Sequence, residues 1–138
     1  MRGDLWRYMV IYEYGGIYAD LDTRCIKPID SWLLKDKEMI VCPENDRDFC
    51  QWTFAATAKH PILKSVLDYI YLVLSSPKYG EKHFVHNHTG PVAWTFGIMN
   101  ALQLNNVNLI DDFEKVNNSD KAKEYKFYLY GEIGRAHV

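Results

Sequence analysis

The strongest constraint on the fold is a change of hydrophobic period at the glycine pair Gly15–Gly16. Apolar residues before this pair recur at helical spacing, so we predict a helix that is capped by Asp4 and runs to about Tyr14. Gly15 supplies the left-handed residue that ends such a helix. The run Ile17–Ala19 then has the composition of a short strand, so a helix is expected to pack directly before a strand.

The rest of the chain continues to alternate between helical and strand patterns. The clearest helix is expected from His60–Pro61 to just before Ser75, and a second from Thr89–Gly90–Pro91 to about Leu104. Strands are predicted at Glu38–Cys42, Phe49–Thr57, Val107–Ile110 and Tyr125–Leu129, and a short helical turn at Pro28–Leu33. Helices that alternate with short apolar strands favour a layered α/β fold.

Composition excludes two classes of function. The chain has 138 residues, of which 48% are hydrophobic, and this is enough to form one core. Its formal net charge is −2 and it has no basic block, so we expect no nucleic-acid partner. No run of about 18 apolar residues occurs, and no membrane segment is therefore predicted in this chain.

The cysteines leave the redox compartment open. Because there are three of them, Cys25, Cys42 and Cys50, at least one sulfur has no disulfide partner within the chain. Cys42 and Cys50 would close a small loop in an oxidising compartment, but three reduced thiols are the interpretation that we favour.

Two carboxylates, Asp20 and Asp22, follow the first predicted strand without a break. In an extended segment alternate side chains share a face, so these two would point the same way while Leu21 packs inward. Neighbouring carboxylates repel unless a cation lies beside them, and this spacing suits a hard ion such as Mg²⁺ or Mn²⁺. At the end of an α/β strand such an ion can hold a diphosphate. The competing interpretation is a solvated turn, because Asp-x-Asp is common by chance.

Asp4 and Arg7 lie three residues apart and therefore share a face of the first predicted helix. We expect this face to run toward the strand that bears Asp20 and Asp22. An exposed ion pair is the alternative interpretation of these two residues.

The segment from Gly3 to Leu33, GDLWRYMVIYEYGGIYADLDTRCIKPIDSWL, resembles part of a known enzyme family. The family is that of DXD-motif sugar-nucleotide glycosyltransferases related to the yeast initiating α-1,6-mannosyltransferase, and it is also similar to the glucosylating domains of clostridial toxins. The likeness rests on the acid and arginine of the helix, the Tyr-Gly-Gly-Ile-Tyr junction and Asp-x-Asp, and it continues more loosely to about Leu104. It implies a GT-A fold and transfer of a hexose, with retention, from a nucleoside-diphosphate sugar.

The resemblance also implies roles for single residues. Asp22 would ligate Mn²⁺ or Mg²⁺ directly, and Asp20 would contact the donor and reach the metal directly or through water. These two acids are the expected catalytic and metal-binding residues. Asp4 and Arg7 match the donor-binding acid and arginine of the family, and Tyr18 would shape the entrance of the strand within the donor site. By the same analogy, the expected donor is GDP-mannose and the acceptor is a glycan or a protein.

Candidates for the acceptor side come from the start of the second long helix. His88, Thr89 and Gly90 stand where backbone N–H groups can receive an anion or a sugar oxygen. A plain surface loop is the simpler interpretation of the histidine-containing segment before them.

The resemblance further implies that this chain is the central part of a catalytic domain. The family's nucleotide-binding strand would precede residue 1 and further diphosphate contacts would follow, so residues 1–132 are expected to be a GT-A piece cut at both ends. Residues 133–138 read as the translation of a common sequencing adapter and are interpreted as a non-native tail. A parent with an N-terminal anchor would lie in the Golgi or secretory pathway, and one without it in the cytoplasm. A non-catalytic carbohydrate- or divalent-metal-binding module and an inactive truncated product remain as alternatives.

Overall fold

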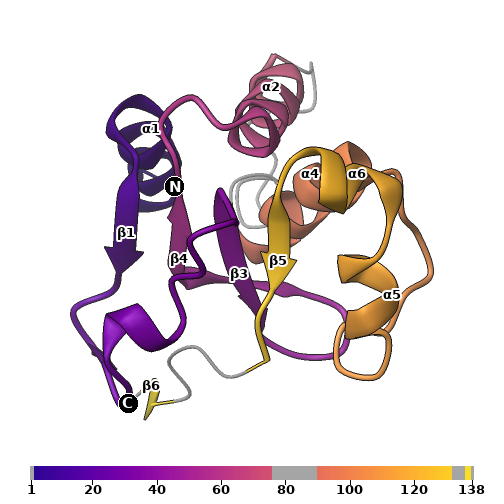
Figure 1. Ribbon diagram of the computed structural model, residues 1–138. Helices are drawn as coiled ribbons and strands as arrows, with labels where there is room; N and C mark the ends of the chain where they lie inside the picture. The colour runs from indigo at the N-terminus through magenta and orange to yellow at the C-terminus, as the bar shows by residue number, and fades with distance from the viewer. Residues whose placement is uncertain (1, 76–89, 132–135, 138) are drawn as a thin grey trace.

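A computed structural model describes residues 2–75, 90–131 and 136–137 of the chain (Figure 1). It is a mixed α/β structure. Its helices and strands, in chain order, are α1 (Arg2–Tyr14), β1 (Gly16–Ala19), β2 (Thr23–Arg24), the 3₁₀ helix η1 (Ile29–Ser31), β3 (Met39–Pro43), β4 (Phe49–Ala56), α2 (Pro61–Leu74), α4 (Pro91–Leu102), α5 (Phe113–Asn117), α6 (Asp120–Glu124), β5 (Phe127–Leu129) and β6 (Ala136–His137).

The centre of the fold is a four-stranded sheet in the order β1-β4-β3-β5 (Figure 1). The pairs β1–β4 and β3–β4 are antiparallel, and β3–β5 is parallel. Ala55 of β4 stands opposite Ile17 of β1 on one side and Ile40 of β3 on the other. A separate two-stranded pairing joins β2 to β6. β1 therefore forms an edge of the main sheet, and the chain leaves this edge directly into the Asp-x-Asp segment.

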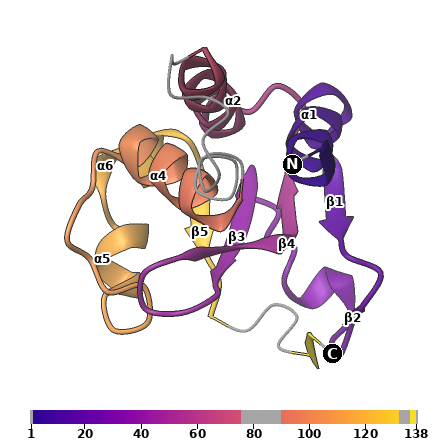
Figure 2. The same ribbon diagram turned by 180° about the vertical axis from the view of Figure 1, so that it is seen from behind.

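The two faces of the sheet are covered unequally. α1, α2 and α4 gather on one face, which the views from both sides show (Figures 1 and 2). The large buried cluster there draws residues from these helices, from the strands and from α5 and α6, with Trp94 and Phe54 fully buried within it. Alternate strand residues point to the other face, where Ile40 and Ala55 pack with Trp32 in a smaller cluster. The second face is covered mainly by the segment around η1.

Glycine allows two close approaches that position the helices. Gly15 ends α1 at a φ of +70°, and a Cβ there would lie 2.7 Å from the backbone nitrogen of Ala58. Gly97 lets α4 approach α2 so closely that a Cβ would lie 2.8 Å from the Cα of Val66. The first contact fixes the sharp passage from α1 into β1, and the second fixes the packing of α2 against α4.

Most of the predicted elements are present, and two details are wrong. The first helix begins at Arg2, so Asp4 lies in its first turn and does not cap it. Val107–Ile110 is not a strand but a turn, because the Asn108 side chain accepts hydrogen bonds from the N–H groups of Ile110 and Asp111, each at 3.0 Å. Such local bonds satisfy the backbone without a neighbouring strand. Among the described residues, no helix is both long and apolar enough to cross a membrane.

Candidate active site

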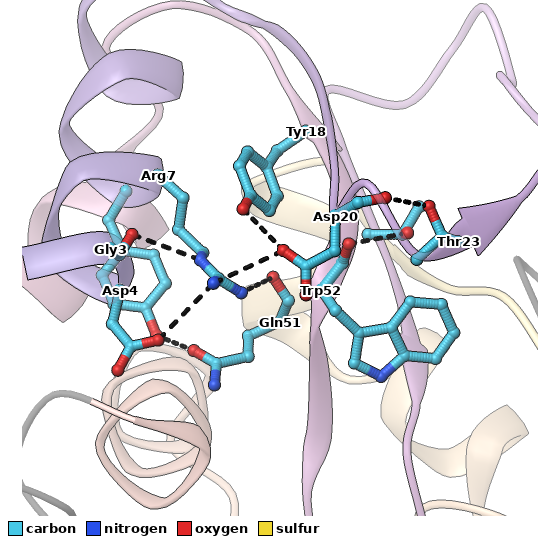
Figure 3. Close-up of polar contacts among 10 residues, drawn as sticks. Gly3, Asp4, Arg7, Tyr18, Asp20, Thr23, Gln51 and Trp52 are labelled. Carbon is cyan, nitrogen blue, oxygen red and sulfur yellow. Dashed lines mark hydrogen bonds and ion pairs between the residues drawn. The ribbon is translucent and has the colours of Figure 1, made fainter. Parts of the chain in front are cut away.

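The Asp-x-Asp segment forms a turn that is tied to the neighbouring strand. The Asp20 N–H donates to the Trp52 carbonyl at 2.9 Å, which fixes where β1 ends. The Asp20 carbonyl accepts from the Thr23 N–H at 3.0 Å and from the Thr23 hydroxyl at 2.6 Å (Figure 3). A turn closed by backbone and side chain together presents both carboxylates at the end of the edge strand.

The expectation of an extended segment here is wrong. Leu21 and Asp22 are turn residues, and Leu21 is fully exposed, where inward packing was predicted. Strand alternation therefore does not place Asp20 and Asp22 on one face. The hydrogen bonds from Thr23 compete with strand geometry, because they satisfy the Asp20 carbonyl locally.

Arg7 is the residue that joins the helix to the turn. Its Nη2 lies 3.6 Å from the Asp4 carboxylate and 3.4 Å from Oδ1 of Asp20. Its Nη1 donates to the Gln51 carbonyl at 3.0 Å, and its guanidinium lies 4.7 Å from the centre of the Tyr18 ring. Figure 3 shows the guanidinium held between α1, β1 and β4. One planar cation thus orients groups from three elements, which a flexible lysine would not do as well.

Tyr18 belongs to this cluster more closely than predicted. Its hydroxyl donates to Oδ1 of Asp20 at 2.6 Å, so it holds the carboxylate and does not merely shape the strand entrance. Partial burial and this hydrogen bond raise the pKa of Tyr18, while the nearby charge of Arg7 opposes the rise. The phenol therefore remains a hydrogen-bond donor at neutral pH. The structure accordingly brings Asp4, Arg7, Tyr18 and Asp20 together.

A buried support lies beneath Arg7. The side chain of Gln51 is buried and accepts a hydrogen bond from the Tyr8 hydroxyl. Its carbonyl faces Arg7. Burial raises the pKa of Tyr8, so its hydroxyl also stays protonated. The sequence feature that could have indicated this support is a glutamine within a mostly apolar strand.

The chemistry of the turn suits a metal that is shared with a substrate. Asp22 is exposed, and both described contacts of the Asp20 carboxylate use Oδ1. Within the described ranges, no group of three or more His, Cys, Asp or Glu side chains could hold a metal. Mg²⁺ and related ions are commonly held by one or two carboxylates together with substrate phosphates, so two acids fit that kind of site.

The structure describes only one of the three acceptor candidates. His88 and Thr89 lie outside the described residues, and Gly90 is a buried residue at the start of α4. Trp32 and Trp94, whose rings could otherwise stack on a sugar, are core residues.

Comparisons with known proteins agree with this geometry. Residues 1–39 match the family described as "Glycosyltransferase sugar-binding region containing DXD motif". The chain is therefore similar, in the part that contains the site, to glycosyltransferases with a DXD motif, and the predicted resemblance is confirmed.

Particular relatives extend the likeness beyond that segment. The chain is 34% identical over 125 residues to the initiation-specific alpha-1,6-mannosyltransferase of Schizosaccharomyces pombe, an alignment that covers 74% of this chain and 32% of the relative. It is 45% identical over 60 residues to inositol phosphoceramide mannosyltransferase 1 of the same organism, covering 44% of this chain and 18% of that protein. The chain thus spans about a third or less of these relatives.

A solved structure supports the fold. The PaToxG glycosyltransferase superimposes with a TM-score of 0.60 at 27% identity, and the match covers 84% of this chain and 37% of that one. The α/β fold class expected from the sequence is confirmed by this match and by the sheet and helices described above.

Proposed function

We propose that this chain is the donor-binding part of a metal-dependent, retaining glycosyltransferase of GT-A type, formed by residues 1–132. The observation that carries the proposal is the cluster around Arg7, which joins Asp4, Tyr18 and Asp20 at the end of an edge strand. The match of this same segment to the DXD family supports it.

Each residue of the cluster has a role in this proposal. Arg7 and Asp4 bind hydroxyl or phosphate oxygens of a nucleoside-diphosphate sugar, because a guanidinium offers several donors in a rigid plane and a carboxylate accepts from sugar hydroxyls. Tyr18 and Arg7 hold Asp20 so that its carboxylate is already oriented when the donor arrives. Preorganised groups of this kind avoid the cost of reorientation during the reaction.

Asp22 and Asp20 hold the ion, with Asp22 as the direct ligand and Asp20 acting directly or through water. Mn²⁺ or Mg²⁺ bound there would offset the negative charge that develops on the departing nucleoside diphosphate. Because the carboxylates lie on a turn tied to β4, the strand fixes their position relative to Arg7.

The donor is proposed to be GDP-mannose, and the acceptor a glycan or a protein. The names of the two fungal relatives both specify mannosyl transfer, which supports mannose. One name specifies an alpha-1,6 linkage and the other specifies inositol phosphoceramide, so the two names do not indicate a common acceptor. The acceptor class is therefore the part of the proposal that experiment must define.

Transfer of labelled mannose from GDP-mannose to a mannoside acceptor tests the proposal, together with hydrolysis of the donor in the absence of acceptor. We expect activity with Mn²⁺ or Mg²⁺, its loss in EDTA, and a loss of roughly 100-fold or more in Asp22→Ala, because one ligand of the ion is removed. Asp30→Asn is the matched control, since Asp30 is an exposed acid outside the turn and should leave activity unchanged.

Calorimetric titration with GDP-mannose and Mn²⁺ separates the alternatives. Metal-dependent binding without transfer or hydrolysis would favour a non-catalytic binding module. A folded chain that neither binds nor turns over the donor would favour an inactive truncated product. Equal activity in the wild type and Asp22→Ala would remove the catalytic assignment of the acid pair.

A further inference from the structure

Two cysteines face each other in the sheet, away from the helices. Cys42 lies on β3 and Cys50 on the adjacent strand β4, and both are buried. The pairing of Pro43 with Phe49 sets the antiparallel register at this end of the two strands. Cys42 and Cys50 each adjoin this pair, at the point where the register of the two strands shifts between Val41 and Pro43.

The two side chains point to the same face of the sheet. Both side chains belong to the small cluster that Trp32, Ile40 and Ala55 form with them. The Cys42 sulfur lies within hydrogen-bonding reach of the Cys50 thiol, and burial, together with that neighbour, raises the pKa of Cys50. A buried, protonated thiol reacts slowly, so the pair is stable in the reduced form once the sheet has closed.

We propose that Cys42 and Cys50 form a disulfide when the chain folds in an oxidising compartment. The two thiols lose two electrons and two protons in total, and an oxidised disulfide such as oxidised glutathione takes them up and leaves as two thiols. A mixed disulfide with one cysteine forms first, before the strands have closed over it. The second cysteine then displaces glutathione and closes the loop between β3 and β4.

The bond would tie down a strand that supports the candidate active site. Cys50 precedes Gln51, whose carbonyl accepts from Arg7. The carbonyl of Cys50 itself accepts from the Trp94 indole N–H at 3.0 Å, so this part of β4 is linked to α4 as well. Oxidation would therefore stabilise the frame that positions Arg7 without touching any group that contacts the donor. This inference does not depend on the proposed glycosyltransferase activity.

Cys25 provides an internal comparison. It is exposed, and its thiol donates to the Lys27 carbonyl at 2.9 Å. Nothing in the described structure brings it into the small cluster of Cys42 and Cys50. We therefore expect Cys25 to react readily with alkylating reagents while the buried pair is protected in the native protein.

Tryptic digestion tests the disulfide directly, because Arg47 lies between the two cysteines. The full chain is exported to the bacterial periplasm, purified, alkylated under denaturing conditions without reductant and digested. We expect peptides 38–47 and 48–59 to be recovered as one cross-linked species that separates on reduction. Protein made in a reducing cytoplasm should give the same two peptides separately, each alkylated.

Two variants make the result decisive. Cys25→Ser should keep the cross-link, and reduction should lower its Tm by roughly 5–10 °C, because the link restricts the unfolded chain. Cys50→Ser should lose both the cross-link and the dependence of Tm on reductant. Separate, alkylated 38–47 and 48–59 peptides from folded periplasmic protein would overturn the inference, as would linkage of Cys25 to either buried cysteine or glutathione on both of them.

Discussion

The helix-covered core and the Asp20 turn are neighbouring regions of one small domain, yet different forces hold them. Trp94 and Phe54 are fully buried and pack with other apolar side chains between the sheet and the helices. Asp20 is only half-buried, and polar contacts to Arg7, Tyr18, Thr23 and the neighbouring strand hold it. Burial of apolar surface area stabilises the core, whereas the directional geometry of hydrogen bonds and ion pairs fixes the turn.

From this difference we predict which substitutions should unfold the protein and which should reduce only donor binding or activity. Loss of a core side chain leaves a cavity that the close-packed interior fills poorly, so stability falls steeply. Loss of one partly exposed polar contact costs little stability, because water replaces it. If core variants lose much stability while turn variants lose little stability but bind the donor poorly, the turn serves binding and not folding.

The largest effect on stability is expected at Trp94. Its ring stacks on Tyr8 at a centroid distance of 4.8 Å and an angle of 8°, and its indole N–H is bonded to a carbonyl. Trp94→Ala should lower the free energy of unfolding by about 3–5 kcal/mol, because it opens a cavity and leaves that carbonyl unsatisfied. Urea unfolding followed by circular dichroism measures the change, and a loss below about 1 kcal/mol would contradict the assigned packing.

A smaller loss is expected from adding one methyl group where α2 and α4 touch. Gly97→Ala would place a Cβ 2.8 Å from both the Cα and Cγ2 of Val66, so the helices must separate. We expect a loss of about 1–3 kcal/mol from overpacking. Gly3→Ala is the matched control: it lies in α1 with nothing within 4 Å, and it should be neutral or slightly stabilising. Equal effects of the two substitutions in urea unfolding would argue against the close helix contact.

His60 gives the core a dependence of stability on pH. Its Nδ1 accepts from the Ile62 N–H at 3.2 Å, and its Nε2 donates to the Tyr125 carbonyl at 2.8 Å, so the ring is neutral. Burial lowers the pKa of His60, although the Tyr125 carbonyl and Glu38 partly oppose this. The folded-state pKa therefore lies below the unfolded value of about 6.5.

Because the pKa of His60 is lower in the folded state than in the unfolded state, the protein should lose stability as the pH falls. The contribution of His60 is fully present above pH of about 6.5 and is lost as the pH falls from there through the lower pKa of the folded state, because the unfolded chain binds more protons in this window. His60→Ala should cost about 1–2 kcal/mol at pH 7.5 and weaken the dependence of stability on pH between 5 and 7. His60→Asn, which can still cap α2, should retain more stability. An unchanged pH profile in both variants would show that His60 does not titrate in this way.

The smallest effect on stability is expected in the turn itself. Asp20→Asn removes a charge 3.4 Å from Arg7 but keeps an oxygen that Tyr18 can donate to, so the free energy of unfolding should change by less than about 1 kcal/mol. Calorimetric binding of GDP-mannose with Mn²⁺ should nevertheless weaken about tenfold or more, as a charged ligand is lost. Asp30→Asn should change neither quantity. A large loss of stability with unchanged binding would make Asp20 a structural residue.

Local patterns predicted most helices and strands correctly, because period and capping residues act over only a few neighbours. The helix that ends at Gly15 and the buried strands β3 and β4 are examples. The strand predicted at Val107–Ile110 was wrong because of another local interaction. The Asn108 side chain accepts hydrogen bonds from nearby N–H groups, and the apolar composition of the segment did not reveal this. The likeness to the DXD family added the grouping of acids and arginine, which periodicity alone did not require.

The α/β alternation, the glycine junction and the candidate residues Asp4, Arg7, Asp20 and Asp22 could all be predicted from the sequence. The folded chain was needed to see that the acids lie in a turn and that Gln51, far along the chain, supports Arg7 from β4. The physical reason is that propensity and spacing concern nearby residues. The direction of a guanidinium, in contrast, depends on partners that the folded sheet alone brings within hydrogen-bonding distance.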